Sequence, residues 1–321
     1  LQEHDIPQRR PSVGRVRGLR AICQGSKGSI HYDLALKEPQ GTTRAGMAGA
    51  GRREVNLYRN LVDQIPLQTP KLMAAHPEGQ WLALELLTNG READHWTAED
   101  YLLATDKLVE LHDRFWGLGE DLKIYPWLTR PLEADFDIYR QAAGTSLERL
   151  MHAPAVEVFR PDINLIPVLK KLVHHLDQVA LSLRKTPDTL IHGDYWPGNL
   201  YIRADGNLVA YDWQQTGIGP GVLDLFTFIQ LSLWWFESIP IDPKTIVERY
   251  RHRLAEINGY AWNQADWNFL WDHALLWTFV ADWIDLLATT PASILRTRYS
   301  QLMSLWLEPV REAVNRHLVE S

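Results

Sequence analysis

The chain has 321 residues, of which 45% are hydrophobic and 23% are charged, so it can form one large domain or two lobes with a sizeable core. Its formal net charge of −7 argues against nucleic acid as a partner, because such binding needs clustered Lys and Arg. The single cysteine, Cys23, excludes an internal disulfide framework and fits a reducing, cytoplasmic setting. The longest apolar stretch, residues 225–236, is too short to cross a bilayer, and the polar residues 1–12 lack the apolar core of a signal peptide. We therefore expect no membrane span and no targeting segment.

The first 90 residues have the pattern of a small sheet with one helix. Residues 16–22 and 30–36 are strand-like and flank a glycine-containing turn, which predicts two strands joined by a tight turn. After a glycine-rich loop, residues 52–64 place apolar side chains at helical spacing, and Pro66 stops that helix. Residues 81–87 indicate another buried strand.

The remaining residues, 91–321, are expected to be mainly helical. Thr97 and Asp100 have the spacing of a capping box, and apolar positions then recur through Trp116. Three further elements are expected: a long helix over residues 163–183, a β-hairpin over residues 200–211, and a helix that begins at Asp242 and Pro243 and ends at Asn258 and Gly259. The boundary between the two parts is expected near residue 90.

Acidic and amide side chains gather in the sequence on both sides of the expected hairpin. Asp194 follows a short apolar strand, Asn199 comes five residues later, and Asp212 follows the hairpin. Phosphoryl transfer needs such a set, because its transition state is stabilised mainly by positioning and by metal ions that neutralise phosphate oxygens. In this arrangement one carboxylate can face a hydroxyl while the other two side chains face magnesium.

The same residues carry a family resemblance. His192, Gly193 and Asp194 with Asn199, followed by Asp212 and Trp213, resemble the motif of aminoglycoside phosphotransferases, choline kinases and the ecdysteroid kinase-like small-molecule kinases, which are similar in fold to protein kinases. The resemblance implies ATP and Mg²⁺ as cofactors. It also implies the following roles: catalytic base for Asp194, magnesium ligands for Asn199 and Asp212, and structural, orienting roles for His192 and Asp224.

A nucleotide site is expected in the N-terminal part. Lys37 ends an apolar strand and Glu54 lies on the next helix, which fits the lysine that touches the phosphates and the glutamate that holds it. Glu85 and Leu87 would form the hinge against which adenine packs, although a plain core strand explains the same residues equally well. The only candidate for a glycine-rich phosphate loop is residues 11–14, and the chain opens on Leu1, which would fit a trimmed N-terminal lobe.

The sequence defines the acceptor substrate less well than the nucleotide site. If residues 264–288 form one helix, Trp267, Trp271, Asp282 and Asp285 fall roughly on one face. Carboxylates beside indole rings would suit a cationic substrate, such as an amine-bearing alcohol or an aminoglycoside. The alternative is that the tryptophans are core residues and the aspartates form a solvated face.

We therefore expect an α+β, protein-kinase-like fold with two lobes, and an ATP- and Mg²⁺-dependent phosphotransferase that acts on a hydroxyl of a small molecule. One rival is a catalytically impaired nucleotide-binding scaffold of the same fold, favoured by the missing glycine loop. A second rival is a metal-dependent hydrolase that uses Asp194, Asp212 and His192 and needs no ATP. The residues leave the choice of ATP or GTP and the oligomeric state open.

Overall fold

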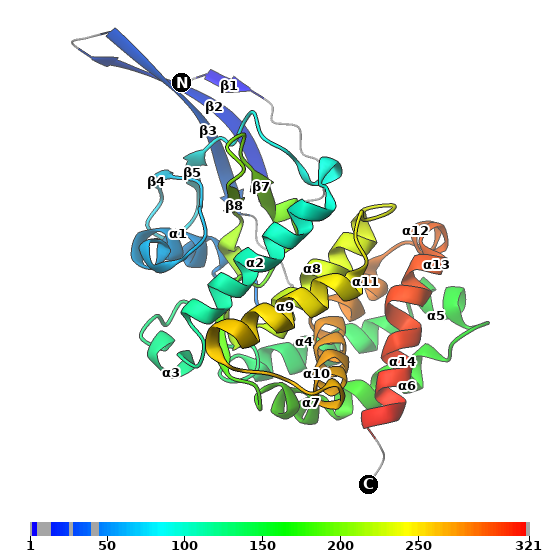
Figure 1. Ribbon diagram of the computed structural model, residues 1–321. Helices are drawn as coiled ribbons and strands as arrows, with labels where there is room; N and C mark the ends of the chain where they lie inside the picture. Colours follow the sequence, from blue (N-terminus) through cyan, green and yellow to red (C-terminus); the bar gives the residue numbers. More distant parts are fainter. Residues whose placement is uncertain (1, 5–13, 26–27, 40–44, 319–321) are drawn as a thin grey trace.

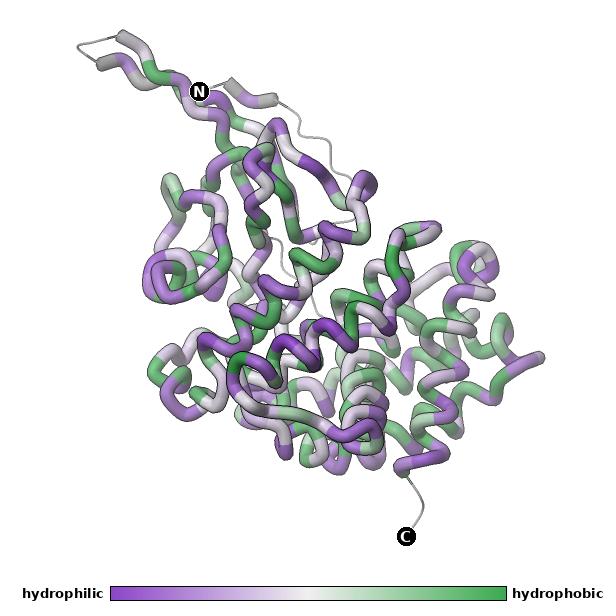
Figure 2. The backbone as a smooth tube through the Cα atoms, viewed as in Figure 1, coloured by the Kyte–Doolittle hydropathy of each residue, from purple (hydrophilic) through white to green (hydrophobic). Residues whose placement is uncertain are grey.

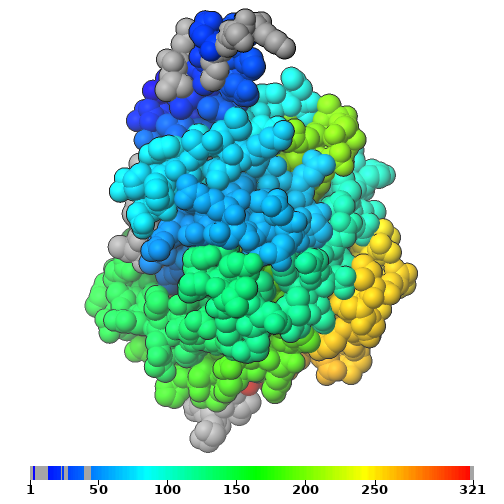
Figure 3. Space-filling model, turned by 90° about the vertical axis from the view of Figure 1, so that its left-hand side faces the viewer, coloured from blue at the N-terminus to red at the C-terminus, as the bar shows by residue number. Residues whose placement is uncertain are grey.

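The computed structural model describes residues 2–4, 14–25, 28–39 and 45–318, and these form two lobes (Figure 1). A small antiparallel sheet with helix α1 (Ala50–Asn60) lies at the N-terminal end, and a larger lobe made mostly of helices follows. The space-filling view shows the small lobe seated directly on the large one (Figure 3). The expected α+β, two-lobed architecture is confirmed.

The small-lobe sheet has five antiparallel strands in the order β1-β2-β3-β5-β4. Their bounds are β1 Gln2–His4, β2 Gly14–Gly25, β3 Gly28–Pro39, β4 Leu72–Ala75 and β5 Leu82–Glu85. The predicted strand pair is confirmed, since β2 pairs with β3 along their whole length. Because β3 meets β5 only from Leu34 to Lys37, the rest of the β2–β3 hairpin projects beyond the sheet as a two-stranded ribbon (Figure 1).

Helix α1 places its apolar face on this sheet and on the large lobe. Gly49, with φ of 69°, turns the chain into the helix, and the buried side chains include Val55, Leu57 and Tyr58. A 3₁₀ turn at Val62–Gln64 continues the helix, as happens often at helix ends. The helix predicted over residues 52–64 is therefore confirmed, with its last turn tightened.

The large lobe consists of helices around two small β-ribbons. The ribbons pair β6 (Asp188–Ile191) with β9 (Gly217–Pro220) and β7 (Leu200–Ile202) with β8 (Leu208–Ala210). The helices are α2 Ala98–Arg114, α3 Gly119–Leu122, α4 Phe136–Leu150, α5 Pro154–Phe159, α6 Leu165–His174, α7 Leu176–Leu183, α8 Val222–Trp235, α9 Pro243–Asn258, α10 Gln264–Thr278, α11 Ile284–Thr289, α12 Ala292–Thr297, α13 Tyr299–Leu302 and α14 Glu308–His317. The predicted hairpin is the β7–β8 ribbon.

Local capping chemistry accounts for the helix ends that were predicted correctly. Thr97 and Asp100 form a reciprocal capping box at the start of α2. Asp242 accepts a hydrogen bond from the Lys244 amide at the start of α9, and Gly259 closes that helix in the left-handed conformation.

One helix prediction is wrong, and a second helix is present as expected but contains an irregular turn. The helix expected over residues 163–183 is broken at His175, so that α6 packs on α4 while α7 packs on α10. The helix expected over residues 264–288 contains a π-helical turn at Phe279–Trp283 between α10 and α11. Because a π turn inserts one extra residue, everything after it is rotated by about 100° relative to a continuous α-helix.

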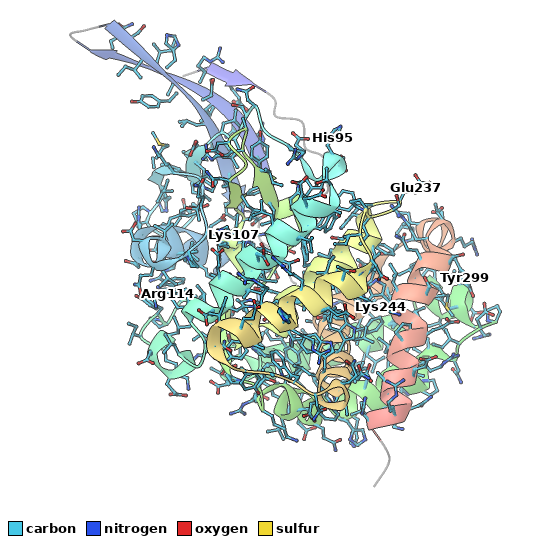
Figure 4. All side chains as sticks on the ribbon, in the orientation of Figure 1. His95, Lys107, Arg114, Glu237, Lys244 and Tyr299 are labelled. Carbon is cyan, nitrogen blue, oxygen red and sulfur yellow. The ribbon has the colours of Figure 1, made fainter. Side chains whose placement is uncertain are left out.

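The distribution of hydrophobic and hydrophilic residues agrees with this arrangement of helices. Hydrophobic and hydrophilic residues alternate along the outer helices (Figure 2), and exposed cations such as Arg114 on α2 and Lys244 on α9 lie on the outside (Figure 4). The most apolar helix, α8, has only 14 residues. Within the described ranges no helix is both long and apolar enough to span a membrane.

Candidate active site

The loop after β6 is held by one buried carboxylate. Asp224, in the first turn of α8, accepts hydrogen bonds from the backbone amides of His192 at 2.7 Å and Gly193 at 2.8 Å. His112 Nε2 of α2 lies 3.3 Å from the same carboxylate. Asp224 is 1% exposed, so these bonds act in a low-dielectric interior and tie the loop to two helices.

Glycine is the only residue type that fits at position 193. Its φ is +82°, and a Cβ atom there would lie 2.3 Å from the Gln215 carbonyl oxygen. Gly193→Ala should therefore destabilise the fold by roughly 2–4 kcal/mol, measured by denaturant unfolding. Gly206 is the matched control, since its φ is +84° but no atom lies within 4 Å of the added Cβ. If Gly206→Ala costs as much as Gly193→Ala, the steric contact with Gln215 is not the cause.

His192 fixes the direction in which the loop leaves the strand. Its buried ring contacts the Tyr211 carbonyl through Nε2 at 3.1 Å, and its Nδ1 accepts from the Asp194 amide at 3.3 Å. The ring centroid lies 4.3 Å from that of Trp213. Burial lowers the pKa of His192, although the carboxylate of Asp224 opposes this effect. A neutral ring protonated on Nε2 satisfies both hydrogen bonds.

Asp194 and Asn199 lie side by side. The Asn199 amide nitrogen donates to the Asp194 carboxylate at 2.8 Å and to the Asp194 backbone carbonyl at 2.9 Å. Asn199 is buried, and its own backbone is bonded to Trp196 and Tyr211. Asp194 is half-buried, so its carboxylate is positioned by the loop and still reaches the surface.

Asp212 follows β8 in a strained conformation and reaches the small lobe. Its φ of 64° is left-handed, which is uncommon for a residue other than glycine, and such strain gathers at functional sites. The buried Trp213 anchors the turn that follows by donating to the Ala210 carbonyl at 3.1 Å. Lys37 Nζ lies 2.5 Å from Asp212 Oδ1 and 2.6 Å from Glu54 Oε2. One ammonium thus joins β3, α1 and the β8 loop.

One cation lies between two carboxylates in this largely buried cluster, in which the Asp212 side chain is 21% exposed. Burial alone lowers the pKa of Lys37, but the nearby carboxylates of Asp212 and Glu54 outweigh it and hold the pKa well above its ordinary value. Burial also raises the pKa of Glu54, and the Lys37 charge partly offsets this. Lys37 is therefore a permanent cation between two acidic side chains.

The donor types around Asp212 fit a magnesium ion. Mg²⁺ binds oxygen ligands, commonly one or two side chains, with water and substrate phosphates completing an octahedron. Asn199 would supply an amide oxygen, because its nitrogen is bonded to Asp194, and Asp212 would supply Oδ2, because Lys37 contacts Oδ1. Asn199 and Asp212 are joined through the backbone, where the Tyr211 amide donates to the Asn199 carbonyl at 3.1 Å.

A family model described as the phosphotransferase enzyme family matches residues 34–273, which is more than half of the chain. The chain belongs to this phosphotransferase enzyme family. Choline kinase LicA from Streptococcus pneumoniae is similar in structure, with a TM-score of 0.55, 14% identity, and coverage of 97% of this chain and 94% of that one. Amicoumacin kinase hAmiN, in complex with AMP-PNP, Ca²⁺ and Ami, has a TM-score of 0.55 and 13% identity, and covers 98% of this chain and 90% of that one. No curated protein sequence matches the chain.

The hinge residues expected in this phosphotransferase lie at the end of β5. The Glu85 carboxylate pairs with Arg203 at 3.0 Å, and its backbone amide donates to the Lys71 carbonyl at 2.9 Å. These contacts fasten Glu85 within the small lobe and to the β7–β8 ribbon. Leu87 is half-buried and makes no backbone hydrogen bond to another described residue, which is compatible with the expected hinge role. Of the expected phosphate loop, residues 11–13 lie outside the described residues, and Gly14 begins β2.

The residues expected to bind the acceptor are separated by the π turn. Trp271 belongs to an aromatic cluster, with its ring 5.0 Å from that of Phe226 and 6.0 Å from that of the buried Trp267. Asp282 lines a small hollow of about 70 Å³ beside the loop after β6, and Asp285 lines a larger one of about 450 Å³ beside α4. Trp271 lines neither hollow, and the expected acceptor role of Trp271, Asp282 and Asp285 stays a prediction.

The structure brings a different indole to the small hollow, here called the inner hollow. It is lined by Ala45, Thr129, Pro131, Tyr139, Ile191, Gly193, Gln215, Leu223, Asp224, Thr227, Trp277, Thr278, Ala281 and Asp282. Trp277, not Trp271, therefore shares this hollow with Asp282. Gly193 also lines this hollow and directly precedes Asp194, so the hollow lies next to the loop after β6.

Sequence reasoning missed Arg53, the neighbour of Glu54 on α1. It is 5% exposed, and its guanidinium donates to four backbone carbonyls: Gly46, Ala48, Trp127 and Gln214. These oxygens belong to the loop before α1, to the large lobe and to the turn after Asp212. In the sequence, Arg53 stands beside Arg52 and looks like one more exposed helix cation.

Proposed function

We propose that the protein is an ATP- and Mg²⁺-dependent kinase that transfers the γ-phosphate to a hydroxyl group of a small molecule. The observation that carries this proposal is the buried Lys37, held between Glu54 and Asp212 at 2.6 and 2.5 Å, next to a loop that presents Asp194 beside Asn199. Family membership supports phosphotransferase chemistry. The AMP-PNP in the amicoumacin kinase structure supports a nucleoside triphosphate as the donor.

In this proposal Asp194 accepts the proton of the attacking hydroxyl. A bond forms between the acceptor oxygen and the γ-phosphorus, the bond from the γ-phosphorus to the β–γ bridging oxygen breaks, and ADP leaves with that electron pair. Asn199 holds the Asp194 carboxylate by a 2.8 Å hydrogen bond, which limits its rotation before the acceptor arrives. The proton moves to the Asp194 carboxylate as the new bond forms.

Lys37 would contact the α- and β-phosphates, as a permanent cation that Glu54 orients from α1. Asn199 and Asp212 would hold Mg²⁺, which when bound neutralises charge on the phosphate oxygens. The Leu87 backbone would receive the adenine. A catalytically impaired scaffold is disfavoured, because the lysine, its glutamate, the candidate base and both candidate metal ligands are all present in one cluster.

The acceptor end of the site favours a cation. The residues that line the inner hollow include Asp224, Asp282 and Trp277, and among the described residues no Lys, Arg or His lines it. Asp224 is already bonded to two backbone amides, and we therefore propose Asp282 as the residue that recognises the acceptor. An ammonium group on the acceptor would gain charge attraction and a cation–π contact of about 0.5–2 kcal/mol. An amine-bearing alcohol is the acceptor class we propose.

The test is ADP release from Mg·ATP across a panel of amino alcohols, aminoglycosides, macrolides, sugars and hydroxyacyl compounds. Substrate-stimulated release, with a phosphorylated acceptor found by mass spectrometry, is the expected result. Mg·ATP binding without release on any member would favour the scaffold. Hydrolysis of a phosphorylated or acylated panel member without ATP would instead establish the hydrolase.

Asp212→Ala should weaken Mg·ATP binding by at least about tenfold, because it removes a metal ligand and one of the two partners of Lys37. Titration calorimetry with and without magnesium measures this directly. Asp137→Ala, which removes a carboxylate that is 80% exposed on α4, is the control and should leave the affinity unchanged. If the magnesium dependence of ATP binding survives in Asp212→Ala, the ligand assignment fails.

A further inference from the structure

Two buried polar groups on α1 have no hydrogen-bond partner among the described residues. They are the Tyr58 hydroxyl and Oε1 of the Glu54 carboxylate, whose other oxygen, Oε2, is bonded to Lys37. Glu54 is 0% exposed and Tyr58 is 6% exposed, so both groups are shielded from solvent. Buried polar groups are nearly always bonded, and an unbonded oxygen on a buried carboxylate is costly. The pair therefore calls for a functional explanation.

The two groups are neighbours on one face of the helix. Tyr58 follows Glu54 by about one turn of α1. Burial raises the pKa of Glu54, and the Trp213 amide opposes that effect without bonding to Oε1. Burial also raises the pKa of Tyr58 well above its ordinary value, and the charges of Glu54 and Asp212 raise it further. The hydroxyl therefore keeps its proton at neutral pH and is a donor next to an unbonded acceptor.

Lys37 has few donors left for the proposed phosphate contacts. Its ammonium has three N–H donors, and Glu54 Oε2 at 2.6 Å and Asp212 Oδ1 at 2.5 Å take two of them. One donor remains for the α- and β-phosphates together, so their oxygens must share the ammonium with the two carboxylates. Phosphate contact therefore weakens the bonds of Lys37 to both Glu54 and Asp212.

The two carboxylates differ in what compensates for a weaker lysine contact. The Asp212 side chain is 21% exposed, so water reaches it, and its Oδ2 is the proposed magnesium ligand. The Glu54 side chain is 0% exposed and gains neither of these contacts. A buried carboxylate whose ion pair is weakened is strongly destabilised unless another donor bonds to it. The Tyr58 hydroxyl is such a donor, and it can turn to Oε1 without breaking another hydrogen bond.

We propose, on the basis of the proposed kinase function, that Tyr58 is a positioning residue: its hydroxyl donates to Glu54 Oε1 when phosphate oxygens share the Lys37 ammonium. This bond keeps Glu54 in place, and Glu54 in turn keeps Lys37 directed at the phosphates. Tyr58 thus acts through Glu54 and not by contact with the nucleotide. Its hydroxyl contributes to Mg·ATP binding and adds nothing to the stability of the protein without nucleotide.

Tyr58→Phe removes only the hydroxyl and is the test. Without nucleotide nothing competes for Lys37 and the variant loses no hydrogen bond, so its free energy of unfolding in denaturant should equal or exceed that of the wild type. Its affinity for Mg·ATP, measured by titration calorimetry, should fall roughly tenfold, the effect of one hydrogen bond to a charged group. In the ADP-release assay the KM for Mg·ATP should rise similarly, while the acceptor KM changes by less than about twofold.

Two other tyrosines provide matched controls. Tyr195→Phe removes a buried hydroxyl that donates to the Ala104 carbonyl at 2.7 Å, so it should lower the free energy of unfolding, in contrast to Tyr58→Phe. Tyr260→Phe makes the same chemical change in the connection between α9 and α10, and it should leave the affinity for Mg·ATP unchanged. If Tyr58→Phe loses as much unfolding free energy as Tyr195→Phe, the hydroxyl has a constant structural partner and the proposal is overturned.

A double-mutant cycle with Glu54→Ala identifies the partner of the hydroxyl. When residue 54 is alanine, Oε1 is gone, and Tyr58→Phe should change the affinity for Mg·ATP by less than about twofold. A full tenfold loss in that background would mean that Tyr58 acts through another group, which overturns the proposal.

Wild-type binding separates failure of this inference from failure of the kinase function. If the wild type binds Mg·ATP and Tyr58→Phe binds it equally well, only the role of Tyr58 is overturned. If the wild type binds no Mg·ATP, the kinase function is overturned and the inference that rests on it is overturned too. Weaker Mg·ATP binding by Tyr58→Phe, at undiminished unfolding free energy, is the result that supports the proposal.

Discussion

Asp194→Asn is expected to lower kcat by about 10²–10⁴-fold, the range that a positioned general base contributes. The substitution keeps the shape of the side chain and the acceptor oxygen for Asn199, whose amide nitrogen lies 2.8 Å from the carboxylate. It removes only the capacity to take a proton from the acceptor hydroxyl. Mg·ATP affinity should stay within about twofold of the wild type, because neither Lys37 nor Asp212 contacts Asp194 through a hydrogen bond.

The measurement is kcat with the best acceptor of the panel, alongside calorimetric titration of Mg·ATP. Asp205→Asn is the matched control, since it makes the same change in the exposed turn between β7 and β8 and should leave kcat unchanged. A variant at position 194 that loses Mg·ATP affinity and kcat together would show that Asp194 supports the nucleotide site and is not the base. If the variant keeps full turnover, Asp194 takes no part in the chemical step.

The parts of the fold that were predictable from the sequence are those that local chemistry determines. The β2–β3 hairpin, the Thr97 capping box and the Asp242 cap each depend on residues that are close together in the chain. The break at His175 and the π turn at Phe279–Trp283 depend on which helices the segments pack against, so no local pattern revealed them. Strand β1 was missed because three residues are too short to show a period.

The candidate site also has parts that could be predicted from the sequence and parts that could not. Asp194, Asn199 and Asp212 surround one hairpin, so their proximity could be inferred from spacing. Lys37 lies 175 residues before Asp212, so spacing could not predict that they are close. Only the family resemblance placed both residues at one site. The hollow that Asp282 lines could not be foreseen, because its lining residues come from segments far apart in the chain, from Ala45 to Asp282.

Arg53 shows most clearly what a sequence cannot reveal. Arg52 and Arg53 are adjacent cations on α1, yet the Arg52 side chain is 63% exposed and Arg53 is 5% exposed. Burial lowers the pKa of the Arg53 guanidinium, although it remains charged at neutral pH. Among the described residues it forms no ion pair with a carboxylate, and backbone carbonyl dipoles alone satisfy it. Burying a cation costs free energy unless hydrogen bonds compensate for the lost hydration. We therefore expect Arg53 to be important for the structure around it.

Arg53→Ala is expected to destabilise the fold by at least about 3 kcal/mol, because it leaves a cavity and four carbonyls without their donor. Arg53→Lys is the informative variant. It keeps the charge, but an ammonium on a flexible stem cannot reproduce a planar fork that reaches three segments. The lysine variant should fold and yet bind Mg·ATP at least about tenfold more weakly. Arg52→Lys is the control on the same helix and should change neither quantity.

The reason for that expectation is the Gln214 carbonyl, which lies in the 3₁₀ turn directly after Asp212. Asp212 stays in its left-handed conformation only while the segments around it hold it there. When Arg53 releases the turn, Asp212 can relax away from Lys37, which weakens nucleotide and metal binding more than it changes the acceptor KM. A general loss of packing would instead affect the affinity for Mg·ATP and the acceptor KM equally. Equal changes in both constants would therefore reject Arg53 as a positioning residue and leave it a role in stability alone.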